Sequence, residues 1–239
     1  MNKLYKPEIV KKVIDDTHYY YVDGVFKPSV TKILQEAMPT PFALRQWIGE
    51  VGNDKAKEKL EKAGERGTAI HNACEEMLRG VEIDLTQFPV EADKKCLVAF
   101  KNWCAEYQPS EIEIETVVAS ELGYAGTRDI KCRLKGRERK TTIDIKTSTA
   151  IYTEHMIQVT GYVQADLEMT GELTDRMILH LNPKTIKGYK VYEEKDMEIE
   201  GKPVTIDDFM TVYKMYLMLN GGKIPQPKEV IDYPLTLKL

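Results

Sequence analysis

The chain has no long hydrophobic run. Its 239 residues contain no stretch of about 18 consecutive apolar residues, so we expect no membrane-spanning helix. The opening residues Met1-Asn2-Lys3-Leu4-Tyr5-Lys6 also lack the apolar segment of a secretory signal peptide. The sequence therefore indicates a cytosolic protein with no membrane partner.

Cysteine is scarce and irregularly spaced. The sequence has four, Cys74, Cys96, Cys104 and Cys132, and no two of them form a C-x₂-C pair. Short pairs of that kind are the usual sign of a cysteine-bound metal. We therefore interpret these residues as buried free thiols in a reducing compartment.

The chain also lacks a positive net charge, which is −4 from 34 basic and 38 acidic residues. Positive charge is nevertheless concentrated in one short stretch, in which Glu138 is the only acidic residue. That stretch contains Lys131, Arg133, Lys135, Arg137, Arg139 and Lys140, and a second contains Lys184, Lys187 and Lys190. Two interpretations remain open: a solvated hairpin whose lysines protect a sheet edge, and a surface that contacts nucleic acid.

No low-complexity linker or internal repeat divides the chain. With 42% hydrophobic and 30% charged residues, it has the composition of a globular protein, and its length suits one domain over residues 1–239. We expect an α/β protein in which an N-terminal helical region, including residues 29–64, precedes a central sheet within residues 112–194.

The pattern of turn residues and apolar spacing predicts the individual elements. Ser29 is the expected N-cap of a helix over 30–37, which the prolines at 39 and 41 end. Helices are expected around Trp47, over 53–62, from Arg66 onward, and over 91–107, 155–170 and 205–219. The expected strands are 112–120, 124–134, 140–147, 176–182 and 189–194, with a hairpin turn near Val22-Asp23-Gly24-Val25.

Two acids and a lysine stand out within the expected sheet. Asp129 ends the segment Gly126-Thr127-Arg128-Asp129, and Asp144-Ile145-Lys146 follows on the next expected strand after a turn at Lys135-Gly136-Arg137. Side chains two residues apart on a strand share a face, so Asp144 and Lys146 should point together while Ile145 points into the core. Two carboxylates and an ammonium group could hold a hard divalent cation against a phosphate.

Other polar residues recur in the order that such a site would need. His71 and Glu75 are four residues apart on one helical face, and so are Gln158 and Tyr162 on a later helix. Glu115 lies on the strand before Asp129 and could reach it. Each feature alone is typical of ordinary surface or core positions; their order along the chain is more specific.

This order resembles that of the PD-(D/E)xK nuclease superfamily, in its RecB-like branch, and in particular the group of mitochondrial genome maintenance and phage exonucleases. The resemblance covers roughly residues 18–170. It is carried by Arg66-Gly67-Thr68 with His71 and Glu75, by Glu115, by Gly123 to Asp129, by Asp144-Ile145-Lys146-Thr147-Ser148, by Gln158 with Tyr162, and by Pro28 to Leu34 with Trp47 in the N-terminal region. The nominal proline before the first acid is replaced by Arg128.

The resemblance implies a restriction-endonuclease-like core, a mixed central sheet flanked by helices, and a role for each matching residue. Asp129, Asp144, Lys146 and, less firmly, Glu115 would be catalytic. His71, Asp129, Asp144 and the Ile145 carbonyl would bind Mg²⁺ or Mn²⁺, and Gln158, Tyr162, Arg66, Arg128 and Thr147 would bind substrate. Some relatives hold an iron–sulfur cluster with cysteines near the C-terminus, but no cysteine follows residue 132 here, so we expect no such cluster.

The expected function is a metal-dependent DNA exonuclease acting on single-stranded DNA or duplex ends, in recombination, repair or replication in a bacterium or phage-infected cell. A recombination or replication protein is an expected partner, and the helices at 29–64 would form an arch or wall that admits a single strand. Two alternatives stay open: an endonuclease of the same superfamily, and a catalytically silent nucleic-acid-binding module. The sequence leaves open the direction of digestion, the choice between DNA and RNA, and the number of metal ions.

Overall fold

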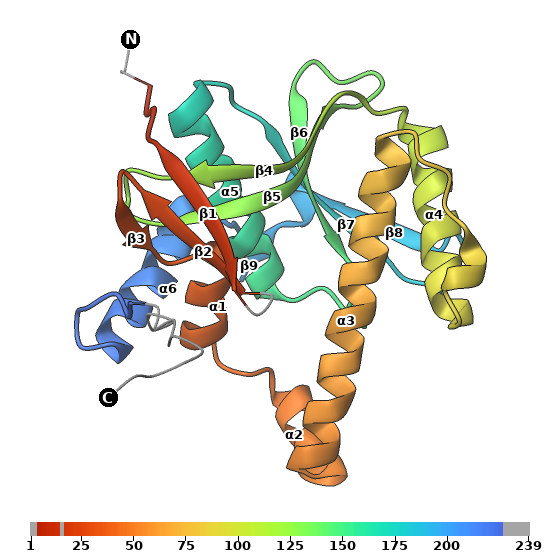
Figure 1. The fold of residues 1–239 in the computed structure, drawn as a ribbon, viewed down its shortest axis with the longest axis horizontal. Coiled ribbons are helices and arrows are strands. Elements are labelled where there is room, and N and C mark those ends of the chain that lie inside the picture. Colours follow the sequence, from red (N-terminus) through yellow and green to blue (C-terminus); the bar gives the residue numbers. More distant parts are fainter. Residues whose placement is uncertain (1–3, 15–16, 227–239) are drawn as a thin grey trace, which may run out of the picture.

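A five-stranded sheet forms the centre of the computed structural model, which describes residues 4–14 and 17–226 (Figure 1). Its strands follow the order β4-β5-β6-β7-β8. They are β4 Ser110–Ala119, β5 Ala125–Arg133, β6 Lys140–Lys146, β7 Asp175–Leu181 and β8 Tyr189–Glu193. All neighbouring pairs are antiparallel except β6 and β7, which are parallel. The mixed α/β fold with a central sheet flanked by helices is the fold class that the sequence predicts.

The antiparallel part of the sheet arises from local turns, and the parallel pair from a helical crossover. Gly136, with φ of +76°, turns the chain from β5 into β6. Helix α5, Thr153–Thr170, then connects β6 to β7, as a parallel pair requires. Every strand expected over residues 112–194 lies within two residues of its observed position.

Helices α3 and α4 cover one face of the sheet (Figure 1). Helix α4, Glu91–Tyr107, matches its predicted bounds and buries Phe100 and Trp103 in the core. Helix α3 runs unbroken from Asn53 to Leu78, which corrects the expectation of one helix over 53–62 and another from Arg66. Its two internal glycines weaken a helix by only about 1 kcal/mol each, so packing of its C-terminal half against α4 and the sheet outweighs them.

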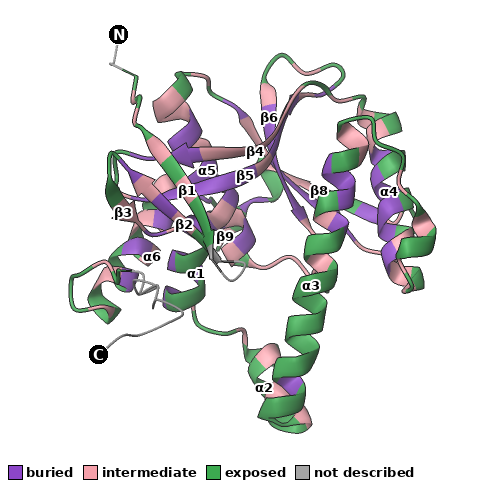
Figure 2. Ribbon diagram, in the orientation of Figure 1, coloured by how far each residue is buried: buried purple, intermediate pink, exposed green. Residues whose placement is uncertain are grey.

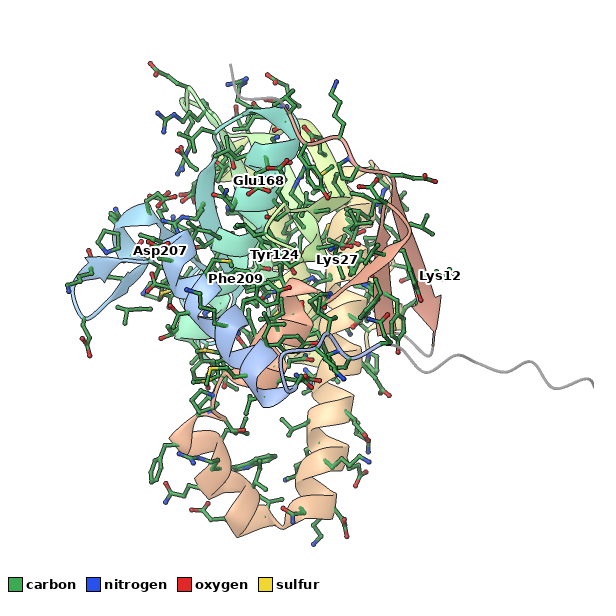
Figure 3. The ribbon with its side chains drawn as sticks, turned by 90° about the vertical axis from the view of Figure 1, so that its left-hand side faces the viewer. Lys12, Lys27, Tyr124, Glu168, Asp207 and Phe209 are labelled. Carbon is green, nitrogen blue, oxygen red and sulfur yellow. The ribbon has the colours of Figure 1, made fainter. Side chains whose placement is uncertain are left out.

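The other face of the sheet packs against α5, α6 (Ile206–Leu219) and α1 (Val30–Ala37). Figure 2 shows buried residues on the central strands and on the helices that pack against them, and Figure 3 shows Tyr124 and Phe209 next to each other. Their ring centroids are 4.5 Å apart. Ser29 caps α1 by accepting a hydrogen bond from the Lys32 N–H at 3.0 Å, as predicted.

The remaining elements lie at the edges. A three-stranded antiparallel sheet is formed by β1 Ile9–Ile14, β2 Thr17–Val22 and β3 Val25–Lys27; β1 has no counterpart in the sequence prediction. Helix α2, Phe42–Val51, buries no residue and projects with the first half of α3 away from the sheet (Figure 1). The short elements are the 3₁₀ turns η1 Leu85–Gln87 and η2 Glu194–Asp196 and the strand pair β9 Glu198–Ile199 and β10 Lys202–Pro203.

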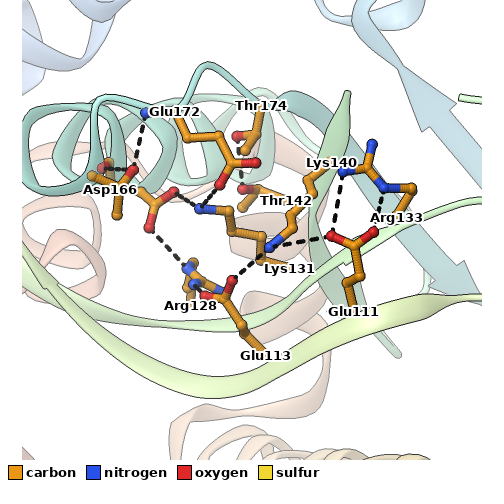
Figure 4. Close-up of polar contacts among 11 residues, drawn as sticks. Glu111, Glu113, Arg128, Lys131, Arg133, Lys140, Thr142, Asp166, Glu172 and Thr174 are labelled. Atoms are coloured by element: carbon orange, nitrogen blue, oxygen red, sulfur yellow. Dashed lines mark hydrogen bonds and ion pairs between the residues drawn. The ribbon is translucent and has the colours of Figure 1, made fainter. Parts of the chain in front are cut away.

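The basic residues of the β5–β6 hairpin are largely neutralised by acids from other elements. Figure 4 shows Lys131 between Asp166 of α5 and Glu172, at 2.7 and 2.8 Å, and Lys140 beside Glu113 of β4 at 3.1 Å. Arg133 pairs with Glu111, Arg137 with Glu193, and Lys187 of the second basic stretch with Glu106. Most of these basic side chains are therefore paired with an acid, in the buried part of the hairpin around Lys131 as well as at its exposed edge.

The four cysteines lie in or beside the core as free thiols, as the sequence predicts. Cys74, Cys96 and Cys132 are buried free thiols, and Cys104 is partly buried beside them. Burial raises the pKa of the Cys96 and Cys104 thiols to about 11. No helix in the described part of the chain is both long and apolar enough to cross a membrane.

Candidate active site

A cavity of about 740 Å³ opens where β5, β6, α1, α3 and α5 meet. Asp129, Asp144, Lys146, His71 and Glu115 line it together, although they come from four elements spread over 76 residues of sequence. Gln158 and Tyr162 of α5 line it as well. The structure thus brings together seven of the eleven predicted site residues.

The cavity forms where β5 and β6 separate. Their ladder ends at the pair Ile130 and Ile143. Beyond this pair the Ile145 N–H donates to the Asp129 side chain, at 2.8 Å, and not to a main-chain carbonyl of β5. The first acid is therefore fixed directly to the residue between the second acid and the lysine.

Asp144 and Lys146 share one face of β6, as strand alternation predicts. Lys146 Nζ lies 2.6 Å from Asp144 Oδ2, and only 2% of Asp144 is exposed. That oxygen is buried and accepts no hydrogen bond of regular geometry. Ile145 between them is fully buried in the apolar core.

Helix α3 brings His71 to the first acid. His71 Nδ1 lies 3.6 Å from Asp129 Oδ2. One turn earlier, Gly67 faces the segment after β6: a Cβ on Gly67 would lie 3.1 Å from Thr147 Oγ1. The Gly67 position thus allows α3 to approach the end of β6 closely, and this approach carries His71 into the cavity.

The alternation of side chains along β5 is interrupted between Asp129 and Ile130. Arg128 points toward Asp166 of α5, whereas Asp129 points toward His71 of α3, and Ile130 also packs on the α3 side. Two consecutive residues thus face α3, which breaks the usual alternation. Glu115 lies opposite, between the pairs Ile114–Ile130 and Thr116–Arg128, and has an unusual φ of +48°. Its carboxylate lies 3.6 Å from Lys11 Nζ of β1.

Helix α5 supplies the wall facing the acids. Gln158 Nε2 donates to the Tyr162 hydroxyl at 3.0 Å, and both contact Thr31 of α1 at 3.4 Å. The Tyr162 ring lies against Gly126 of β5, where an added Cβ would be 2.6 Å from Tyr162 Cε1. Sequence analysis identified Gln158 and Tyr162 but not Thr31, whose segment Pro28 to Leu34 was matched only as a block.

Three predicted substrate-binding residues and one metal-binding residue do not line the cavity. Arg66 is held by Asp93 of α4, and Thr147 faces Gly67. Arg128 is 1% exposed and paired with Glu113 and Asp166 on the opposite face of the sheet, which corrects its placement among the substrate contacts. The Ile145 side chain is buried in the core, as strand alternation predicts.

Burial dominates the electrostatics of the site. It raises the pKa of both Asp129 and Asp144 to about 6, against the lowering effect of Lys146. Burial, with Lys146, lowers the pKa of His71 to about 4, so the ring is neutral near pH 7 and keeps a lone pair for a ligand. Burial and Glu115 raise the pKa of Glu75 to about 7.

The donor set fits a hard divalent cation that keeps open positions. Within residues 4–14 and 17–226, no three His, Cys, Asp or Glu side chains gather closely enough to form a metal cluster by themselves. The carboxylates of Asp129 and Asp144, which both line the cavity, suit Mg²⁺ or Mn²⁺, because these ions usually take few protein ligands and complete their shell with water and substrate phosphate.

Comparison with known proteins shows only distant likeness. No protein-family model matches the chain, and no curated protein matches it. Among solved structures, SSO0001 aligns with a TM-score of 0.38 and 13% identity, over 80% of this chain and 84% of that one. A proposed exonuclease from Eubacterium rectale aligns with a TM-score of 0.35 and 11% identity, over 86% and 80%.

Proposed function

We propose that this chain is a metal-dependent nuclease that hydrolyses DNA phosphodiester bonds, acting from strand ends. The observation that supports this best is the meeting of Asp129, Asp144 and Lys146 in one cavity at the point where two strands separate. An ordinary surface ion pair would be exposed. Here Asp144 is buried beside Lys146, and Asp129 is held by a hydrogen bond from the neighbouring strand.

Each residue has a definable part in this proposal. Asp129, Asp144 and the Ile145 carbonyl would hold Mg²⁺ or Mn²⁺, with His71 beside them. The bound metal would supply Lewis acidity toward the phosphate and an acidified water. Lys146, fixed by Asp144, would orient the attacking water and offset charge on the phosphate oxygens.

Action at strand ends is supported by the residues around the acids. His71 from α3 and the Gln158 and Tyr162 pair from α5, which match the exonuclease branch in sequence, enter the same cavity as the acids. Hydrolysis would leave a 5′-phosphate and a 3′-hydroxyl, as the resemblance implies. A recombination or replication protein remains a proposed partner.

The test uses 5′- and 3′-labelled single strands, a linear duplex and a closed circle, each with Mg²⁺, Mn²⁺ or EDTA. We expect metal-dependent loss of the linear substrates and survival of the circle, and the label pattern gives the direction. Cutting of the circle would indicate an endonuclease. Binding without cutting of any substrate would indicate a silent binding module.

A further inference from the structure

Three uncharged hydrogen-bonding side chains meet on the cavity wall that faces the acids. Thr31 comes from α1, in the region before the core, whereas Gln158 and Tyr162 come from α5. The contact from Gln158 Nε2 to the Tyr162 hydroxyl is 3.0 Å, and the two contacts to Thr31 Oγ1, from Gln158 and Tyr162, are both 3.4 Å. All three residues line the cavity.

This group has more hydrogens to donate than its own contacts use. The Gln158 amide carries two and each hydroxyl carries one. Gln158 directs its two hydrogens to the hydroxyl oxygens, and either hydroxyl can donate to the other. Whichever donates, the remaining hydroxyl hydrogen has no acceptor in the contacts of the described residues. Of the two hydroxyls, that of Thr31 belongs to an exposed residue of the cavity wall, whereas Tyr162 is only 4% exposed, so Thr31 is the one that a ligand can reach.

The lysines that line the cavity are each paired with an acid, Lys146 with Asp144 at 2.6 Å. Lys32 also lines the cavity, but its ammonium lies 2.7 Å from Glu36 on the same helix. A non-bridging phosphate oxygen only accepts hydrogen bonds, so it complements a surplus neutral donor. A divalent cation would bind the acids across the cavity instead.

We propose that Thr31 is a substrate-binding residue, whose hydroxyl donates to a non-bridging oxygen of a phosphodiester next to the scissile one. This inference rests on the proposed nuclease function and extends its site to α1. Gly126 is a positioning residue for this contact, because only the missing Cβ leaves room for the Tyr162 ring that orients the pair.

The experiment measures binding separately from cleavage. Thr31→Val, which keeps the shape and removes the hydroxyl, and Thr31→Ser, which restores it, are made in an Asp144→Asn background and titrated against a fluorescent single-stranded oligonucleotide. Thr211→Val is the matched control, since Thr211 is exposed on α6 and donates to Asp207 of its own helix. The oligonucleotide is then remade with one methylphosphonate, moved through each phosphate that flanks the scissile position.

We expect Thr31→Val to weaken binding by about three- to tenfold, the effect of one neutral hydrogen bond, and Thr31→Ser to recover most of that loss. At one position the methylphosphonate should weaken binding by the Thr31 protein but have no further effect with Thr31→Val. Equal effects of the methylphosphonate on both proteins at every position would overturn the role of Thr31.

Failure of this inference is distinguishable from failure of the nuclease proposal. If the unmodified chain cleaves DNA but no methylphosphonate position couples to Thr31, the nuclease stands and the Thr31 contact is wrong. If coupling is found but the unmodified chain cleaves nothing, the strand-binding role of Thr31 stands and the nuclease proposal is wrong.

Discussion

The Asp129 carboxylate accepts a hydrogen bond from the Ile145 N–H, and this bond ties the two acid-bearing strands together where their ladder ends. It holds the first acid in place before any ligand binds. A buried carboxylate kept for ligand binding destabilises the unliganded fold at neutral pH, because folding removes the charge from water. The site should therefore affect the pH dependence of the free energy of unfolding as well as catalysis.

Asp129→Asn should stabilise the metal-free protein as the pH rises. The pKa of Asp129 is raised from 3.8 to about 6 in the fold, so its contribution to stability is complete below about pH 4 and is lost as pH rises through 6. An asparagine cannot ionise, so this loss of stability is removed, and its side-chain oxygen can still accept the hydrogen bond from the Ile145 N–H. Urea unfolding in EDTA should show a gain of about 1–3 kcal/mol at pH 7.5 that falls to about a third of that size at pH 4.5.

Asp175→Asn is the control for this comparison, because Asp175 lies at the start of β7, outside the active-site cavity. It should change stability little at either pH. An Asp129→Asn gain of the same size at pH 4.5 and 7.5 would contradict the assignment of the effect to titration.

Gly126→Ala should destabilise the protein by about 1–3 kcal/mol, because the new Cβ would lie 2.6 Å from the Tyr162 ring. In a Tyr162→Ala background the same change should have a much smaller effect, because the clashing ring is gone. Chemical denaturation of the four proteins gives the coupling energy. A coupling energy near zero would mean that the ring does not lie on Gly126.

Gly64→Ala should stabilise the protein, in contrast to Gly126→Ala. Gly64 lies within α3, has an ordinary helical backbone, and an added Cβ would meet nothing within 4 Å. We expect stabilisation by about 0.5–1 kcal/mol from helix propensity, with cleavage unchanged, read from thermal and urea unfolding. A destabilised variant would count against one continuous helix through this position.

Asp166→Ala should destabilise the protein by about 1–3 kcal/mol, because the buried charges of Arg128 and Lys131 lose their shared partner and keep only Glu113 and Glu172. Glu111→Ala, which breaks the exposed pair with Arg133, is the matched control and should have an effect of at most about 1 kcal/mol. Equal losses in the two variants would show that the Arg128 side of the sheet is not a buried ionic network.

Local patterns made much of the fold predictable. Strand alternation placed Asp144 and Lys146 together, and Ser29 marked the start of α1 correctly. Local propensity failed at Gly64 and Gly67, because α3 continues through both glycines into its packed C-terminal half. Strand β1 was missed because Ile9 to Ile14 does not alternate clearly between apolar and polar residues.

The features that could not be predicted from the sequence depend on contacts between segments far apart in the chain. The acids that neutralise the basic hairpin come from β4, α5 and β8, so their effect could not be read from the hairpin itself. The opposite facing of Arg128 and Asp129 could have been inferred from alternation, since they are adjacent on a strand. Thr31 gave no signal of its own within the matched block Pro28 to Leu34, because only folding brings α1 to α5.

The most direct test of the account is single-turnover cleavage of a 5′-labelled single strand by the unmodified chain, Asp144→Asn and Asp175→Asn, in Mg²⁺ and in EDTA. We predict metal-dependent cleavage by the unmodified chain and by Asp175→Asn, and a loss of about 10²–10⁴-fold in Asp144→Asn with strand binding retained. An Asp144→Asn variant that folds, binds the strand and cleaves at the unmodified rate would contradict the central claim.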